Sequence, residues 1–187
     1  MTKDDVSELP GFLHVDHIAI AVRQGELEGQ VAAYRQLGFR EVHREEVLGT
    51  DQVREVLLQI GDGPNLIQLL EPLSAASPVE KLIERNGGRG GFAHMALRVQ
   101  NAQAAFDYMK DNGFSLIDKA PRPGSRGTTV FFVHPKSRAD SPFGYLIEVV
   151  EDPSDPRPSE PRPEGSGQSG GPRPRPSEPR PSGSARP

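Results

Sequence analysis

The sequence predicts an α+β domain made of two tandem βαβββ units, whose strands join in one curved, barrel-like sheet with the helices outside. Three observations predict this fold class: a strand headed by histidine that occurs twice, an amphipathic stretch stopped by Gly-Phe after each copy, and two similar segments that close the halves. A single unit of this kind leaves one sheet face uncovered. We therefore expect the two units to pair about a pseudo-twofold axis.

The repeat begins with two strand-like runs that share a histidine in their first position and a valine in their last. HIAIAV runs from His17 to Val22, and HMALRV runs from His94 to Val99, 77 residues later. The halves also end alike, because LIQLLE at Leu66–Glu71 matches LIEVVE at Leu146–Glu151 with an offset of 80 residues. The two offsets differ only by loop length, so both halves are expected to have the same order of elements.

Helices and further strands are expected between these landmarks. Amphipathic stretches that end in Gly-Phe predict helices over Leu27–Leu37 and Ala102–Asn112, and a short linking helix is expected over Ser77–Asn86. Runs bounded by Gly, Pro, Asp or Asn predict three more strands in each half. These are Arg40–Glu45, Gln52–Ile60, Asn65–Leu70, Ser115–Asp118, Thr128–His134 and Gly144–Val150.

The folded domain is expected to cover residues 9–152, with half one at about 13–72 and half two at about 90–152. Residues 153–187 contain eleven prolines, many glycines and serines, and no aliphatic or aromatic side chain other than Ala185. Such a composition cannot bury enough apolar surface to offset its chain entropy. We therefore predict a disordered, Pro/Arg/Ser/Gly-rich tail.

Charge and composition exclude several classes of partner. The formal net charge of the chain is -4, and the tail has six arginines against four acids, so the folded part is more acidic than the whole. That balance argues against nucleic acid as a partner, since nucleic-acid binding requires a basic surface. The chain contains no cysteine, and it shows neither a signal peptide nor a run of membrane-spanning length. A cytoplasmic protein without a membrane partner is expected.

The duplication also selects four candidate metal ligands. Equivalent positions meet near a pseudo-twofold axis, and the polar equivalents are His17 with His94 and Gln68 with Glu148. Gln68 and Glu148 share a strand face with apolar residues, where an unpaired polar group is costly. Two imidazoles, a carboxylate and an amide oxygen suit one divalent ion, and the sequence does not choose among Co, Mn, Ni, Zn and Fe.

Several longer runs together cover nearly all of Val15 to Asp152. They are DHIAIAV, VREVLLQIGDGPNLIQLLEPLSAASPVEKLIERNGG, HMALRV, PRPGSRGTTVFFVHPKS and LIEVVED. These runs resemble the methylmalonyl-CoA epimerase family of the vicinal-oxygen-chelate superfamily, which also contains glyoxalases, bleomycin resistance proteins and extradiol dioxygenases. The resemblance implies a glyoxalase-like fold and places the family's metal ligands on His17, Gln68, His94 and Glu148.

The resemblance further implies an isomerase that removes and returns the 2-proton of an acyl-CoA thioester through a metal-stabilised enolate. Glu55 and Glu148 are the acid-base pair that it implies, so Glu148 would be both metal ligand and acid-base group. Substrate-binding candidates for the phosphates of coenzyme A are Arg126, Lys136 and Arg138. Pseudo-symmetry and open sheet edges favour a homodimer.

Three departures from the family's pattern are Ala93, the turn Leu48–Gln52 and the insertion Arg138–Phe143, and the last two leave the acyl group open. Other readings of the same fold are a glyoxalase-type lyase or isomerase, an extradiol dioxygenase, and a ligand-binding module without catalytic activity. An extradiol dioxygenase needs only two histidines and one carboxylate, so Gln68 in the fourth position argues against that alternative. A binding module typically lacks the metal residues, which are present here.

Overall fold

Eight strands form one curved sheet, in the order β2-β3-β4-β1-β5-β8-β7-β6, in the computed structural model, which describes residues 8–137 and 143–154. The strands are β1 (Phe12–Ala21), β2 (Arg40–Val47), β3 (Val53–Gln59), β4 (Leu66–Pro72), β5 (Gly91–Val99), β6 (Arg122–Pro123), β7 (Thr129–Val133) and β8 (Leu146–Glu151). The helices are α1 (Leu27–Gln36), α2 (Pro78–Arg85) and α3 (Ala102–Asp111), with a 3-10 turn at Ser125–Gly127. The predicted tail from residue 155 onward lies outside the described residues.

The two halves join through antiparallel pairing of β1 with β5 at the centre of the sheet. Within each half the histidine-headed strand pairs in parallel with the closing strand: His17 aligns with Leu66 in the first half, and His94 aligns with Leu146 in the second. These are the equivalent positions of the sequence repeat. The predicted fold class, an α+β domain of two βαβββ units with a barrel-like sheet, is confirmed.

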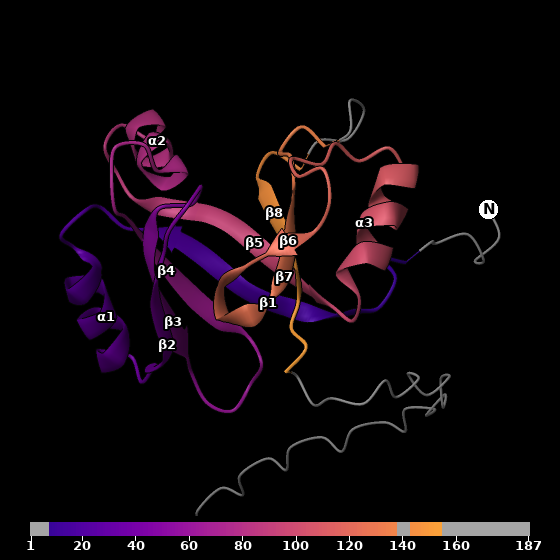
Figure 1. Ribbon diagram of the computed structural model, residues 1–187. Helices are drawn as coiled ribbons and strands as arrows, with labels where there is room; N and C mark the ends of the chain where they lie inside the picture. Colours follow the sequence, from indigo (N-terminus) through magenta and orange to yellow (C-terminus); the bar gives the residue numbers. More distant parts are fainter. Residues whose placement is uncertain (1–7, 138–142, 155–187) are drawn as a thin grey trace, which may run out of the picture. The chain divides into compact units, whose positions relative to one another are not determined.

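Helices α1 and α3 cover the same side of the sheet, one over each half (Figure 1). Leu27 and Val31 of α1 pack with Val56, Leu58 and Leu69 of β3 and β4. In the second half, the corresponding side chains are Ala105, Phe106 and Met109 of α3, which pack with Phe131, Val133, Ile147 and Val149. Because strand side chains alternate between faces, the residues between these core positions point to the opposite side, which contains the candidate site.

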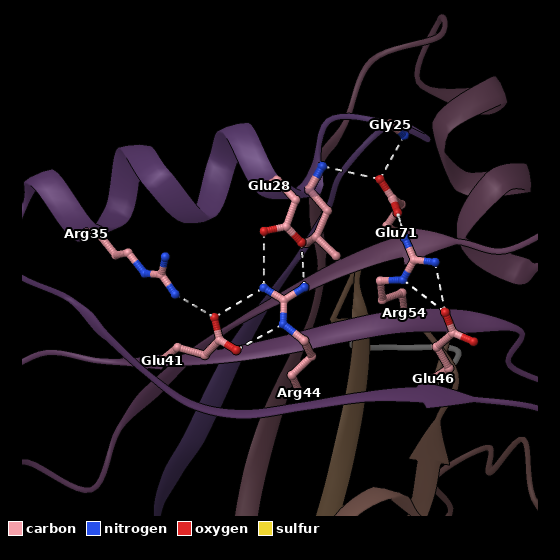
Figure 2. Close-up of polar contacts among 9 residues, drawn as sticks. Gly25, Glu28, Arg35, Glu41, Arg44, Glu46, Arg54 and Glu71 are labelled. Carbon is pink, nitrogen blue, oxygen red and sulfur yellow. Dashed lines mark hydrogen bonds and ion pairs between the residues drawn. The ribbon is translucent and has the colours of Figure 1, made fainter.

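A glutamate at the end of each closing strand binds the start of the helix in the same half. Glu71 Oε1 accepts hydrogen bonds from the backbone N–H groups of Gly25 at 2.8 Å and Leu27 at 3.2 Å (Figure 2), and Glu151 accepts one from Ala102 N–H at 2.7 Å. Free N–H groups at a helix N-terminus favour a nearby negative charge. The matching ends of the repeat therefore fix both helices to the sheet.

One expected strand is largely missing, because Ser115–Asp118 contributes a single bridge between Leu116 and Val133. The Asp118 carboxylate accepts from the backbone N–H of Phe132 at 2.7 Å, at a point where a regular strand would continue its ladder of backbone bonds. The edge strand is instead β6 at Arg122–Pro123, and Arg122 Nε donates to Asp118 Oδ1 at 3.0 Å. A side chain thus replaces part of the backbone pairing, which periodicity could not reveal.

Gly90 allows the linking segment to lie against β1, and this close approach gives a stability prediction. A Cβ atom added at Gly90 would lie 2.3 Å from the carbonyl oxygen of Ala21, so one backbone segment would have to move. We expect Gly90→Ala to lower the free energy of unfolding by about 1–3 kcal/mol in urea denaturation followed by circular dichroism. Gly29→Ala is the matched control, because a Cβ in this position of α1 meets no described atom within 4 Å. It should raise stability by about 0.5–1 kcal/mol, and equal losses in the two variants would contradict the steric argument.

Candidate metal centre

Three buried side chains from neighbouring strands converge on one point. His17 Nε2 lies 3.1 Å from His94 Nε2 and 3.1 Å from Glu148 Oε2, and His94 Nε2 lies 3.2 Å from the same carboxylate oxygen. Three contacts would need three bridging hydrogens, but the two Nε2 atoms supply at most two. At least one contact therefore has no bridging hydrogen and sets like groups, either two lone pairs or two N–H groups, against each other. A cation at this point would resolve the conflict, so the donor set fits a metal ion.

His17 reaches the cluster because β1 is irregular at this position. Val15 pairs with Leu97 and Ile18 pairs with Met95, so two residues of β1 oppose one residue of β5. Such a bulge redirects side chains that would otherwise alternate between the faces. Asp16 and His17 are both buried as a result, although they are adjacent in the strand.

Asp16 orients the His17 ring, and the sequence analysis missed this residue. His17 Nδ1 donates to Asp16 Oδ1 at 2.7 Å, which leaves Nε2 directed at the cluster. Arg98 Nε donates to Asp16 Oδ2 at 2.6 Å, and Arg126 Nη2 lies 3.4 Å from Oδ1. A carboxylate that holds the second nitrogen of a histidine is common behind metal-binding histidines. The signal in the sequence was an aspartate directly before the repeated histidine, where the second half has Ala93.

The two histidines have opposite pKa shifts in the metal-free chain. Burial disfavours a charge on His17, but the hydrogen bonds and charges of Asp16 and Glu148 raise its pKa to about 9. Burial lowers the pKa of His94 despite its contact with Glu148. For the acids, burial is outweighed by the charged groups around them: His17, Arg98 and Arg126 lower the pKa of Asp16 to about 2, and the two histidines lower that of Glu148.

Glu55 and Gln68 lie in the same cavity as His94 and Glu148, a space of about 610 Å³. Gln68 Nε2 donates to Glu55 Oε2 at 2.9 Å, whereas Gln68 Oε1 has no hydrogen-bond partner among the described residues. A buried amide oxygen without a donor is costly. Ala19 pairs with both Gln68 and His94 across the sheet, so the amide is one strand removed from the histidine. The oxygen of this amide lies in the cavity without a donor from the described residues.

Burial raises the pKa of Glu55, and the negative charge of Glu45 adds to this effect against the opposing influences of Ser125, Arg126 and His43. Glu55 is 3 % exposed, as expected for a side chain that points into the cavity. The two glutamates of the cavity are thus in contrasting environments, since the pKa of Glu148 is lowered and that of Glu55 is raised.

The residues predicted to bind substrate phosphates are scattered. Arg126 lies against Asp16 in a left-handed conformation with φ of 55°, and Lys136 is exposed. Arg138, together with most of the insertion Arg138–Phe143, lies outside the described residues. Two other arginines, Arg85 and Arg122, line the cavity and were not predicted. Sequence patterns could not select them because their loops and helix ends meet only in the folded chain.

Comparisons with known proteins agree with this architecture. The model of the Glyoxalase/Bleomycin resistance protein/Dioxygenase superfamily matches residues 16–132. Human mitochondrial methylmalonyl-CoA epimerase is 30% identical over 137 residues, which are 73% of this chain and 73% of the human protein. The crystal structure of methylmalonyl-CoA epimerase from Mycobacterium tuberculosis has a TM-score of 0.68 at 30% identity, covering 79% of this chain and 93% of that one.

A second similar structure contains a ligand. It is a variant of Streptomyces coelicolor methylmalonyl-CoA epimerase in complex with 2-nitronate-propionyl-CoA, with a TM-score of 0.68 at 32% identity, and the match covers 76% of this chain and 99% of that chain. The chain therefore belongs to the glyoxalase/bleomycin resistance protein/dioxygenase superfamily and, within it, to the methylmalonyl-CoA epimerase family. In the part of the chain that the structure describes, every helix is too short or too polar to cross a bilayer.

The shifted pKa of His17 predicts that metal binding releases a proton. Near pH 7 the metal-free ring carries a proton, because its pKa is about 9, and binding through Nε2 requires that proton to leave. Apparent affinity should therefore rise about tenfold per pH unit from pH 7 to about 9, and then level off. Calorimetry in buffers of different ionisation enthalpy should show release of about one proton per ion at pH 7. Binding without proton release at pH 7 would contradict the raised pKa.

Removing the carboxylate behind His17 should weaken the metal site. Asp16→Asn takes away the charge that holds Nδ1–H, so we expect about 10–100-fold weaker divalent-ion binding and less proton release at pH 7. Asp152→Asn is the matched control, because Asp152 also pairs with Arg98, at 3.0 Å, and the described contacts of Asp152 do not include His17. Equal losses in both variants would show that the effect comes from Arg98 rather than from the orientation of His17.

Proposed function

We propose that the protein is a metal-dependent epimerase that interconverts (R)- and (S)-methylmalonyl-CoA, or a closely related 2-acyl-CoA. The observation that carries this proposal is the presence of two carboxyls of contrasting pKa, Glu55 and Glu148, in a cavity that is also lined by Gln68 and His94. Epimerisation at a 2-acyl carbon needs an acid-base group on each side of that carbon. Complexes of family members with methylmalonyl-CoA and 2-nitronate-propionyl-CoA support an acyl-CoA substrate.

The resident metal would be held by His17, His94, Glu148 and the free amide oxygen of Gln68. When bound, a divalent ion supplies a Lewis acid that stabilises negative charge developing on the thioester oxygen of the substrate. The protein contributes a buried set of donors that is already assembled. The Asp16 carboxylate fixes the His17 ring with Nε2 toward the site, so less ordering is needed on binding.

The contrasting environments of the carboxyls assign a direction to proton transfer. In the metal-free chain Glu148 is an anion, which is the form that removal of the 2-proton requires, and the raised pKa of Glu55 favours the protonated form, which suits delivery of a proton to the opposite face. For the other epimer the roles reverse. Gln68 positions Glu55 by donating to its Oε2, and it leaves Oε1 of the carboxyl for the proton.

The cavity wall also suits the proposed substrate. Leu70, Val79, Leu82, Val130 and Phe132 supply apolar surface around the acid-base groups and limit access of water to the reacting carbon. Arg85 and Arg122 add positive charge, and we propose them, with Lys136, Arg126 and Arg138, as groups available to the anionic parts of the acyl-CoA. A homodimer stays a prediction based on pseudo-symmetry.

The proposal is tested with methylmalonyl-CoA in deuterated water, followed by proton NMR and a stereospecific assay of the 2-carbon. Metal-loaded protein should epimerise the substrate and incorporate deuterium, and chelator-treated protein should do neither. Glu55→Gln keeps the shape of the side chain but cannot transfer the proton, so epimerisation should fall by about 10²–10⁴-fold. Glu46→Gln, whose side chain pairs with Arg54 on the other face of the sheet, should retain full activity.

If none of the five candidate metals supports exchange, the epimerase proposal is overturned. The same donor set would then point to the lyase, dioxygenase or binding-module alternatives. If Glu55→Gln keeps full activity and metal-dependent exchange, the epimerase reaction is supported but Glu55 takes no part in it.

A further inference from the structure

A second group of metal-ligating side chains lies on β2 and β3. His43 Nε2 is 3.0 Å from Glu45 Oε2 and 3.8 Å from Glu55 Oε1, and one donor atom from each of the three residues lies within 4.8 Å of the others. Glu45 pairs directly with Glu55 across the two strands, and His43 is two residues before Glu45. Strand periodicity therefore places all three on one face of the sheet.

The carboxylate of Glu55 has one oxygen that the protein does not satisfy. Oε2 accepts from Gln68, whereas Oε1 is buried and has no hydrogen-bond partner in the described part of the chain. This side chain is 4 % exposed, and Oε1 faces His43 Nε2 across the 3.8 Å gap. Glu45 lies directly opposite Glu55 on the adjacent strand, so ionisation of both carboxyls together is unfavourable. A cation between the three donors would relieve both problems.

We propose that His43, Glu45 and Glu55 form a second divalent-cation site, separate from the centre at His17, His94 and Glu148. One imidazole and two carboxylates favour a borderline ion such as Zn²⁺, with water completing the coordination. The site opens to solvent, since the side chains of His43 and Glu45 are 27 % and 33 % exposed. A cation can therefore reach it without passing through the cavity.

Occupation of the second site withdraws Glu55 from acid-base chemistry. The free oxygen of Glu55 becomes a ligand and can no longer carry the proton that epimerisation requires. Divalent ions are then activating at the first site and inhibitory at the second. This regulatory consequence rests on the proposed function, whereas the binding of the second ion does not.

Binding is tested by equilibrium dialysis of the full chain against micromolar Zn²⁺, with bound zinc measured by mass spectrometry. The wild-type chain should bind two ions, and His43→Gln and Glu45→Gln should each bind one. Glu46→Gln is the matched control: it removes the same charge from the same strand, but its side chain pairs with Arg54 at 2.8 Å on the opposite face (Figure 2). It should bind two ions.

A variant of the first centre isolates the second site. His94→Ala should retain one zinc ion, and the double variant His94→Ala with Glu45→Gln should retain none. Circular dichroism confirms that each variant is folded before binding is compared. The proposal is overturned if the wild-type chain binds a single ion that is lost in His94→Ala, or if a second ion persists in both His43→Gln and Glu45→Gln.

The regulatory role of the second site is tested by measuring the rate of epimerisation at increasing zinc concentrations. The protein is loaded with metal at the first centre beforehand. Zinc should inhibit the wild-type chain and Glu46→Gln at the concentration that fills the second site. In Glu45→Gln the inhibitory concentration should rise by more than about tenfold. Inhibition that is the same in all three proteins would overturn the regulatory role. Absence of epimerase activity would instead count against the proposed function, and the dialysis result would still decide the second site.

Discussion

The antiparallel pairing of β1 with β5 is the interaction on which the remaining architecture depends. It joins two βαβββ units into one sheet and brings His17 and His94, which are 77 residues apart, to an Nε2–Nε2 distance of 3.1 Å. Glu148 reaches the same point because β8 pairs in parallel with β5. A bulge in β1 turns His17 into the cluster. Without this pairing, the donors would belong to two separate half-sheets.

Duplication provides the donors, and departures from symmetry give them different chemistry. Asp16 stands beside His17, whereas the equivalent position beside His94 is Ala93, so the pKa of His17 is raised and that of His94 is lowered. Glu148 is the counterpart of the neutral Gln68. The one carboxylate in the cluster of His17, His94 and Glu148 therefore comes from the second half. This asymmetry leaves the amide of Gln68 able to hold Glu55, which lies in the same cavity as Glu148.

Alternation along the closing strands separates structural from chemical roles within a few residues. Glu71 and Glu151 point outward and bind the N-termini of α1 and α3, while Gln68 and Glu148 point into the cavity. A one-residue slip in register would exchange these faces and place the apolar core residues in the site. The contacts that fix the helices to the sheet therefore also preserve the positions of the candidate ligands.

The sequence by itself determined the two-unit fold, three helices within about one residue of their observed ends, and the placement of His17 with His94 and of Gln68 with Glu148 on equivalent strands. Repeats and strand periodicity are local signals, so they can be read without coordinates. Only the tertiary structure decided the pairing of Asp16 with Arg98, 82 residues away, the hydrogen bond from Gln68 to Glu55, and the reduction of the expected strand at Ser115–Asp118. These features depend on a bulge and on side chains that meet across strands, where position is set by packing rather than by spacing along the chain.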